Sequence, residues 1–126
     1  MDPADRKYTQ EHEWVRLDGD TAVVGITHFA QDQLGDVVYV ELPKVGDRVE
    51  QMKPFGVIES VKTASDLFAP VTGTVVEVND GLTSAPETVN DAPYESGWLI
   101  KVKPDNASEI DALMTADQYS AHVSGS

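Results

Sequence analysis

Short apolar segments separated by turn-forming residues run through most of this 126-residue chain. Residues 14–17 and 21–26 flank the sequence Asp18-Gly19-Asp20, which is a hairpin signal. Further segments of the same kind cover residues 37–42, 55–60, 65–69, 74–78 and 98–102. Residues 82–96 read as a loop with one helical turn near 87–90. Short strands at close spacing, joined by polar turns, predict a small sandwich or barrel.

Two helical segments interrupt or follow these strands. A short helix near residues 28–34 is predicted, because Thr27 can cap its start and Gly35 can end it. The C-terminal part is also predicted to be helical, over 108–114 and again after the capping box formed by residues 115–118.

Size and residue types exclude several classes of protein. The length predicts a single domain over residues 1–126, short of an ordinary enzyme with a deep substrate pocket. Cysteine is absent, so there is no disulfide framework, thiolate metal site or cysteine nucleophile. The three histidines are far apart along the chain and lack metal-site spacing. No nucleotide-binding or hydrolase fingerprint occurs.

Targeting signals are also missing from the sequence. No stretch approaches the roughly 20 apolar residues of a membrane span. Residues 1–7 contain two acids and no apolar core, unlike a signal peptide or a typical transit peptide. We therefore expect a bacterial cytoplasmic protein, or a mitochondrial matrix protein if the chain is a mature eukaryotic one.

The chain is strongly acidic. Nine basic and twenty-two acidic residues give a formal net charge of −13. This charge opposes binding to nucleic acid or to an anionic membrane, since both require lysine and arginine to neutralise phosphates. It is compatible with attraction to basic partner surfaces and equally with solubility alone.

Lys62 stands between two apolar arms, residues 55–60 and 65–69, where a hairpin would otherwise turn with Asn-Gly or Asp-Gly. Such a turn lifts one amine clear of the surface, which suits a residue that is to be modified. The run resembles the attachment hairpin of lipoyl and biotinyl carrier domains.

The resemblance extends to nearly the whole chain. Matching blocks cover residues 12–14, 25–27, 30–31, 34–43, 59–62, 69–73, 89–90, 93–94 and 97–102. In this order, from about Tyr8 to Tyr119, they resemble the H-protein family of the glycine cleavage system. The fold that this implies is mainly β, a barrel-sandwich hybrid of the lipoyl-carrier type. The short helix and the C-terminal helical segment would pack against it.

The resemblance implies a lipoylated shuttle that is not itself an enzyme. Lipoic acid would form an amide with the Lys62 amine after a lipoyl ligase or transferase acts on it. The arm would take an aminomethyl group of glycine from a PLP-dependent glycine decarboxylase to a folate-dependent aminomethyltransferase. Dihydrolipoyl dehydrogenase would then reoxidise it. We expect a monomer, although a dimer across an exposed barrel edge stays open.

Three further site residues follow from the resemblance. Glu13 and Asp66 would hold the ammonium end of the loaded arm in a cleft that limits access of water. Glu59, three residues before Lys62, would be recognised by the ligase. Position 11 is often serine in similar sequences, so Glu11 here puts the geometry of one side of the cleft in doubt.

Competing functions are a biotin carrier, a protein that relays lipoyl groups to other complexes, and an unmodified interaction module. A biotin carrier usually presents Met-Lys-Met, whereas this chain has Val61-Lys62-Thr63. The relay is compatible with the same lysine. The interaction module differs from the lipoyl carriers, because its Lys62 would take up no lipoyl group from a ligase.

Overall fold

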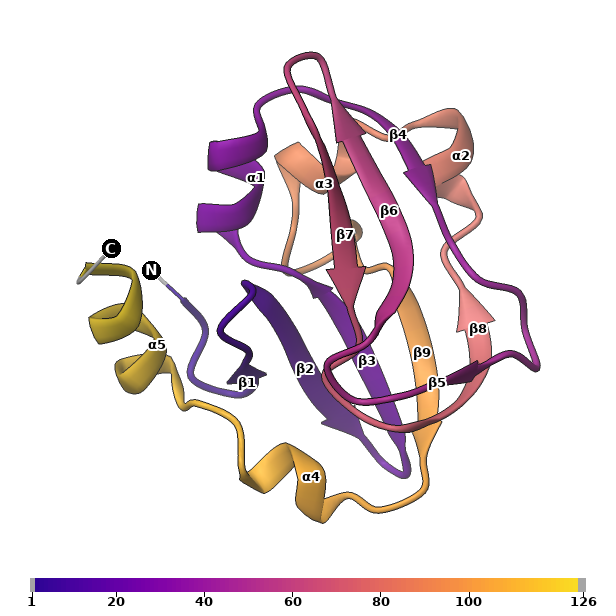
Figure 1. The fold of residues 1–126 in the computed structure, drawn as a ribbon, viewed down its shortest axis with the longest axis vertical. Coiled ribbons are helices and arrows are strands. Elements are labelled where there is room, and N and C mark those ends of the chain that lie inside the picture. The colour runs from indigo at the N-terminus through magenta and orange to yellow at the C-terminus, as the bar shows by residue number, and fades with distance from the viewer. Residues whose placement is uncertain (1, 125–126) are drawn as a thin grey trace.

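The computed structural model describes residues 2–124, whose strands form two antiparallel sheets (Figure 1). A three-stranded sheet lies across one face of a six-stranded sheet, and one of its hairpins projects beyond the rest of the molecule. Within these residues the two sheets stay separate and do not close into one barrel. The predicted fold class is confirmed as mainly β, with the short helix and the C-terminal helical segment in place.

The six-stranded sheet contains most of the strands. In spatial order these are β1 (Lys7–Tyr8), β2 (Glu13–Asp18), β3 (Thr21–Ile26), β9 (Ile100–Pro104), β8 (Gly73–Val78) and β5 (Arg48–Val49). The predicted hairpin of β2 and β3 turns at Gly19, whose φ of 66° lies in the left-handed region that glycine adopts without penalty. The sheet therefore starts from a locally encoded turn.

Both faces of β3 are buried, which explains its nearly continuous apolar sequence, and the first three residues of β2 are buried beside it. Val15 and Val24 are directly paired and belong to the main core between the sheets. Trp14 and Val23 point to the other face, where they join a smaller aromatic cluster. Because successive strand residues alternate between faces, the two adjacent residues Trp14 and Val15 serve two different cores.

The three-stranded sheet carries the projecting hairpin. Its strands are β4 (Val37–Glu41), β6 (Pro54–Ser60) and β7 (Ala64–Phe68), with β6 in the centre. Ile58 and Leu67 face the main core, with 1% and 2% of their surfaces exposed. Burying each such side chain contributes about 1.5–3 kcal/mol to the free energy of unfolding.

Five short helices connect or cover the sheets within residues 2–124. They are α1 (His28–Leu34), α2 (Gly81–Ser84), α3 (Thr88–Asp91), α4 (Ser108–Asp111) and α5 (Ala116–Ser124). The predicted start of α1 is confirmed, because the Thr27 hydroxyl accepts a bond from the Ala30 amide. The predicted capping box is confirmed too: Thr115 and Gln118 each donate a backbone N–H to the side chain of the other.

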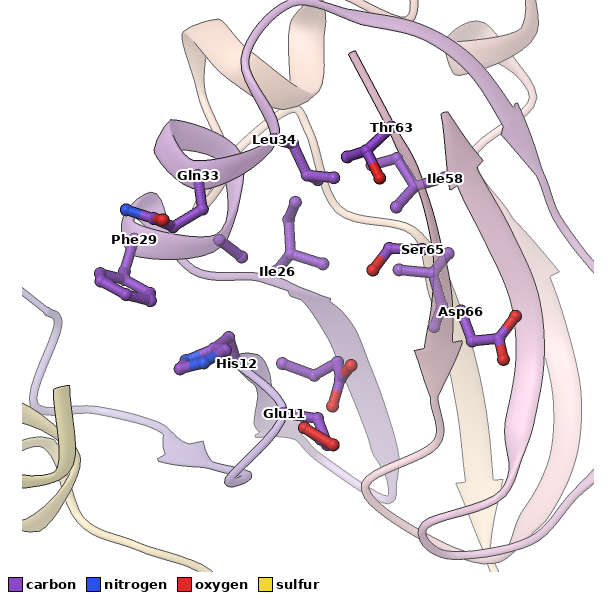
Figure 2. Close-up of a pocket in the computed structure, with 13 residues that line it drawn as sticks. Glu11, His12, Ile26, Phe29, Gln33, Leu34, Ile58, Thr63, Ser65 and Asp66 are labelled. Carbon is purple, nitrogen blue, oxygen red and sulfur yellow. The ribbon is translucent and has the colours of Figure 1, made fainter. Parts of the chain in front are cut away.

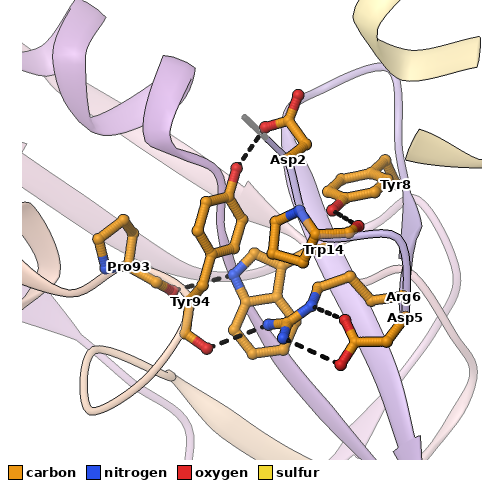
Figure 3. Close-up of polar contacts among 8 residues, drawn as sticks. Asp2, Asp5, Arg6, Tyr8, Trp14, Pro93 and Tyr94 are labelled. Atoms are coloured by element: carbon orange, nitrogen blue, oxygen red, sulfur yellow. Dashed lines mark hydrogen bonds and ion pairs between the residues drawn. The ribbon is translucent and has the colours of Figure 1, made fainter. Parts of the chain in front are cut away.

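The aromatic cluster joins the N-terminal segment and α5 to the outer face of the larger sheet. Figure 3 shows the N-terminal side chains Arg6 and Tyr8 around Trp14. Tyr8 and Tyr119 are stacked, with ring centroids 4.8 Å apart. The indole N–H of Trp14 donates to the carbonyl of Pro93 at 3.0 Å. The Arg6 guanidinium lies 4.6 Å from the centroid of the same indole, a cation–π arrangement. Segments from both ends of the sequence are thus fixed to one strand.

The sequence prediction differs from the structure in two regions. The helical turn predicted near 87–90 is confirmed as α3, but residues 82–84, predicted as loop, belong to a second helical turn, α2, which begins at Gly81. The last strand runs from Ile100 to Pro104, two residues later than the predicted segment 98–102. Pro104 occupies the final position and pairs with Gly73, a place where its missing N–H is tolerated.

Gly46 and Gly73 serve the fold for different reasons, which gives a test. A Cβ at Gly73 would lie 2.2 Å from the Lys103 carbonyl oxygen, whereas Gly46 has open space but a φ of 97°. We expect Gly73→Ala to lower the free energy of unfolding by about 3 kcal/mol through overpacking. Gly46→Ala should cost about 1 kcal/mol for the left-handed backbone. Urea denaturation followed by tryptophan fluorescence measures both, and equal losses would contradict the distinction.

Candidate functional site

The predicted lysine hairpin is present, and Lys62 lies at its tip. Glu59 pairs with Ala64, and the Ser60 amide donates to the Thr63 carbonyl at 2.7 Å, so Val61 and Lys62 form the two-residue turn. The Val61 side chain is 71% exposed, and Lys62 is exposed as well. Within residues 2–124 the Lys62 amine has no ion-pair partner.

The turn closes without glycine because of a serine that the sequence reasoning missed. Backbone N–H groups of Lys62 and Thr63 donate to the Ser60 hydroxyl at 3.3 and 3.2 Å. Serine hydroxyls commonly stabilise turns in this way, so a serine two residues before the lysine was the available signal. Ser60 thereby holds the backbone of the tip while the Lys62 side chain remains available.

A cleft of about 360 Å³ begins beside the hairpin tip and runs between α1 and β7 to the connection between β1 and β2 (Figure 2). Thr63, the neighbour of Lys62, lines one end, whereas Glu11 lines the other. Glu13, two residues after Glu11 at the start of β2, lines the cleft as well. The walls between them are largely apolar and include Ile26, Phe29, Ala30, Leu34, Ile58 and Leu67. The cleft is therefore apolar over most of its length and acidic at its far end.

Glu13 is the buried carboxyl of this cleft, with 2% of its surface exposed. One carboxyl oxygen accepts a bond from the Thr9 hydroxyl at 2.6 Å, and the other accepts from the Phe68 amide at 3.2 Å. Burial raises the pKa of Glu13 to about 8, against the opposing effect of these two hydrogen bonds. Near neutral pH the cleft thus contains a largely protonated acid.

Asp66 also lines the cleft, but it remains exposed. Its cross-strand partner is Val57, whereas Ser65 pairs with Ile58 and faces the cleft with it. Because side chains alternate along β7, Ser65 and Asp66 point to opposite sides of the strand (Figure 2). The sequence analysis identified Asp66 and missed the Ser65 hydroxyl.

Glu59 lies near the lysine but outside the cleft. It pairs with Tyr39 on one side and Ala64 on the other, and it is exposed. Two of the three predicted acids, Glu13 and Asp66, are therefore among the residues that line the cleft, whereas Glu59 is not. The Asp66 side chain points away from the cleft-facing Ser65, to the sheet face that also carries Glu59, so the structure does not bring it together with Glu13.

His12 connects the far end of the cleft to α5. Its Nδ1 lies 2.8 Å from the Tyr119 hydroxyl, which is itself 2.7 Å from the Thr27 hydroxyl. The rings of His12 and His122, which we considered far apart from their sequence positions, have centroids 5.8 Å apart. Burial lowers the pKa of His12, and His122 acts in the same direction. Within the described residues no three acidic or histidine side chains form a metal site.

The chemistry of this site fits a long, flexible acyl chain with a cationic end. The amine that would carry the chain stands next to one end of the cleft, and apolar walls suit methylene groups. Carboxyls at the other end suit an ammonium group. Arrangement and fold together define a carrier of a covalently attached cofactor.

Comparison with known proteins agrees with this class. A family model described as glycine cleavage H-protein matches residues 6–125. The glycine cleavage system H protein of Bacillus pumilus is 58% identical over 117 residues, which are 93% of this chain and 92% of that protein. Its counterpart from Anaeromyxobacter sp. strain K is 58% identical over 121 residues, which are 96% and 94% of the two chains. The crystal structure of the Mycobacterium marinum protein superposes with a TM-score of 0.90 at 41% identity, covering 97% of this chain and 98% of that one.

The chain belongs to the glycine cleavage H-protein family. Proteins of this family carry lipoate and act as carriers, not enzymes, within the glycine cleavage system, whose other enzymes are therefore implied as partners. The family and the carrier role predicted from the sequence are confirmed. No helix within residues 2–124 is long and apolar enough to cross a membrane.

The burial of Glu13 predicts an unusual pH dependence of stability. The folded state holds its proton up to about pH 8, whereas the unfolded state releases it near 4.5. The free energy of unfolding should therefore fall between these values as pH rises, with a slope of up to about 1.4 kcal/mol per pH unit from this one group. Urea titrations at several pH values should show this slope in the wild type and lose it in Glu13→Gln.

The exposed Glu41→Gln provides the control for this measurement, because it removes one acid without removing a buried one. Its slope should match that of the wild type. Parallel slopes for wild type and Glu13→Gln would show that Glu13 is ionised in the folded state over this range.

Proposed function

We propose that Lys62 is the lipoyl attachment site and that the cleft shelters the loaded end of the arm. The lysine at the tip of a projecting hairpin, next to a cleft with an acidic far end, is the observation that supports this proposal. Acylation joins the Nζ atom to the lipoyl carbonyl carbon and removes the lysine's positive charge. The formal net charge then changes from −13 to −14.

The lipoyl group supplies the thiol and disulfide chemistry that this cysteine-free chain lacks. In the proposed cycle the chain takes the aminomethyl group of glycine from the PLP-dependent decarboxylase to the folate-dependent aminomethyltransferase. It delivers electrons to dihydrolipoyl dehydrogenase. It acts as a monomer in the bacterial cytoplasm, and residues 1–126 form one carrier domain.

Within the cleft, Glu13 would act as a charge-responsive acceptor. An ammonium group next to a carboxyl stabilises its ionised form. Entry of the loaded arm would therefore expel the proton that Glu13 holds in the empty cleft, and an ion pair would form in a place where water is largely excluded. The exposed carboxylate of Asp66 would contribute from the β7 side.

Glu59 would serve a different step, the recognition of the hairpin by the lipoyl ligase. It is exposed, and β6 holds it on the outer face beside the tip rather than in the cleft. A ligase that accepts the Lys62 amine would approach this face without disturbing the residues that hold the arm.

Modification of Lys62 is tested by mass spectrometry after incubation with a lipoyl ligase, lipoate and ATP. The wild type should gain the mass of one lipoyl amide, located by peptide mapping to Lys62, and Lys62→Ala should gain none. Lys53→Ala is the matched control, because Lys53 is another exposed lysine and lies just before β6. Lipoylation of Lys62→Ala, or an unmodified wild type, would overturn the proposed attachment site.

The proposed protection of the aminomethyl group by Glu13 is tested on lipoylated protein that the decarboxylase has loaded with this group. The loaded protein is then kept without the aminomethyltransferase, and the release of ammonia is followed. Glu13→Gln should release ammonia about tenfold faster than the wild type, the effect of losing one hydrogen bond to a charged group. Glu41→Gln removes the same charge from an exposed position outside the cleft and should release ammonia at the wild-type rate. Equal rates for all three proteins would show that Glu13 does not shelter the arm.

A further inference from the structure

The hairpin tip rests on the connection between α1 and β4. The Val61 amide donates to the Asp36 carbonyl at 3.1 Å, which joins the turn to this connection. The Lys62 side chain runs past the neighbouring Gly35, where an added Cβ would lie 3.4 Å from Lys62 Cε. The position of this connection therefore influences where the lysine is presented.

Asn90, on α3, holds that connection from the opposite side. Its side-chain oxygen accepts a bond from the Val37 amide at 2.9 Å. Its side-chain nitrogen donates to the Gly35 carbonyl at 2.8 Å and to the Gln31 side chain at 3.0 Å. Two of these three bonds reach the backbone on either side of Asp36, the residue that accepts from the hairpin tip.

An asparagine meets these requirements through its one amide group. The site needs an acceptor for an N–H and donors for a carbonyl and a side-chain oxygen, and a primary amide supplies both. Aspartate keeps the acceptor for Val37 but has no donor for the Gly35 carbonyl. Alanine leaves every one of these backbone groups without its partner.

We infer that Asn90 is a positioning residue for the modification of Lys62, acting through the α1–β4 connection. This inference rests on the proposed lipoylation of Lys62. Without Asn90 the connection is free to shift, and the bond between Val61 and Asp36 weakens. The tip then spends less time in the orientation that a modifying enzyme binds. The enzyme therefore binds the protein substrate more weakly, which raises KM rather than lowering kcat.

The test compares Asn90→Ala with Asn79→Ala as a matched control. The Asn79 side chain also donates to two backbone carbonyls, those of Ser96 and Trp98, at 2.9 and 2.7 Å. Steady-state lipoylation by a ligase with lipoate and ATP gives KM for the protein and kcat. We expect Asn90→Ala to raise KM about tenfold with little change in kcat. A tenfold change corresponds to the free-energy contribution of about one hydrogen bond. Asn79→Ala should keep both constants near wild type.

Amide hydrogen exchange supplies a readout that does not depend on lipoylation. In Asn90→Ala the Val61 amide should exchange faster, because its acceptor belongs to the loosened connection. The Ser60 amide, which donates to Thr63 within the hairpin, should keep its protection. In Asn79→Ala both amides should exchange as in the wild type.

Several outcomes would overturn the inference. A wild-type KM for Asn90→Ala, or an equal rise of KM in Asn79→Ala, shows that Asn90 does not act on the lysine. If Asn90→Ala does not fold, Asn90→Asp replaces it, and a wild-type KM there has the same meaning. An unmodified wild-type protein would instead overturn the proposed attachment site itself.

Discussion

The register of β6 against β7 is the constraint on which the site depends. Ile58 and Leu67 must both face the core, and a slip of one residue would turn each of them to the surface. The same register decides that Val61 and Lys62, rather than their neighbours, occupy the turn. It also decides that Ser65 faces the cleft and that Glu59 faces away from it. Core packing thus sets both the place of the amine and the lining of the cleft beside it.

The cleft combines an apolar surface with one buried carboxyl, that of Glu13, which lowers the stability of the fold. Burying Glu13 lowers the stability of the folded protein above the pH at which free glutamate ionises, even with two hydrogen bonds to its oxygens. Such local departures from a good core are typical of functional sites. Around it the fold is fixed by ordinary means, including the caps of α1, the Tyr8–Tyr119 stack and the bond from Trp14 to Pro93.

Features encoded by adjacent residues could be predicted from the sequence. Gly19 marked the first hairpin, Thr27 and Gly35 marked α1, and Lys62 marked the projecting turn. Features that need distant segments could not be predicted in this way. The two-residue strand β1 has no periodicity and exists because it pairs with Trp14 and its neighbour. The proximity of His12 to His122 and the cleft between α1 and β7 likewise follow only from the folded chain.

The protonated state of Glu13 has an electrical consequence. In a carrier that works as proposed, an ammonium-ended arm outside the cleft leaves Glu13 neutral, whereas the docked arm leaves it ionised and sends a proton to the solvent. The two forms then differ by one proton, and therefore by one elementary charge. The mean electrophoretic mobility of the loaded protein would thus change with the fraction of arms that are docked, without any label.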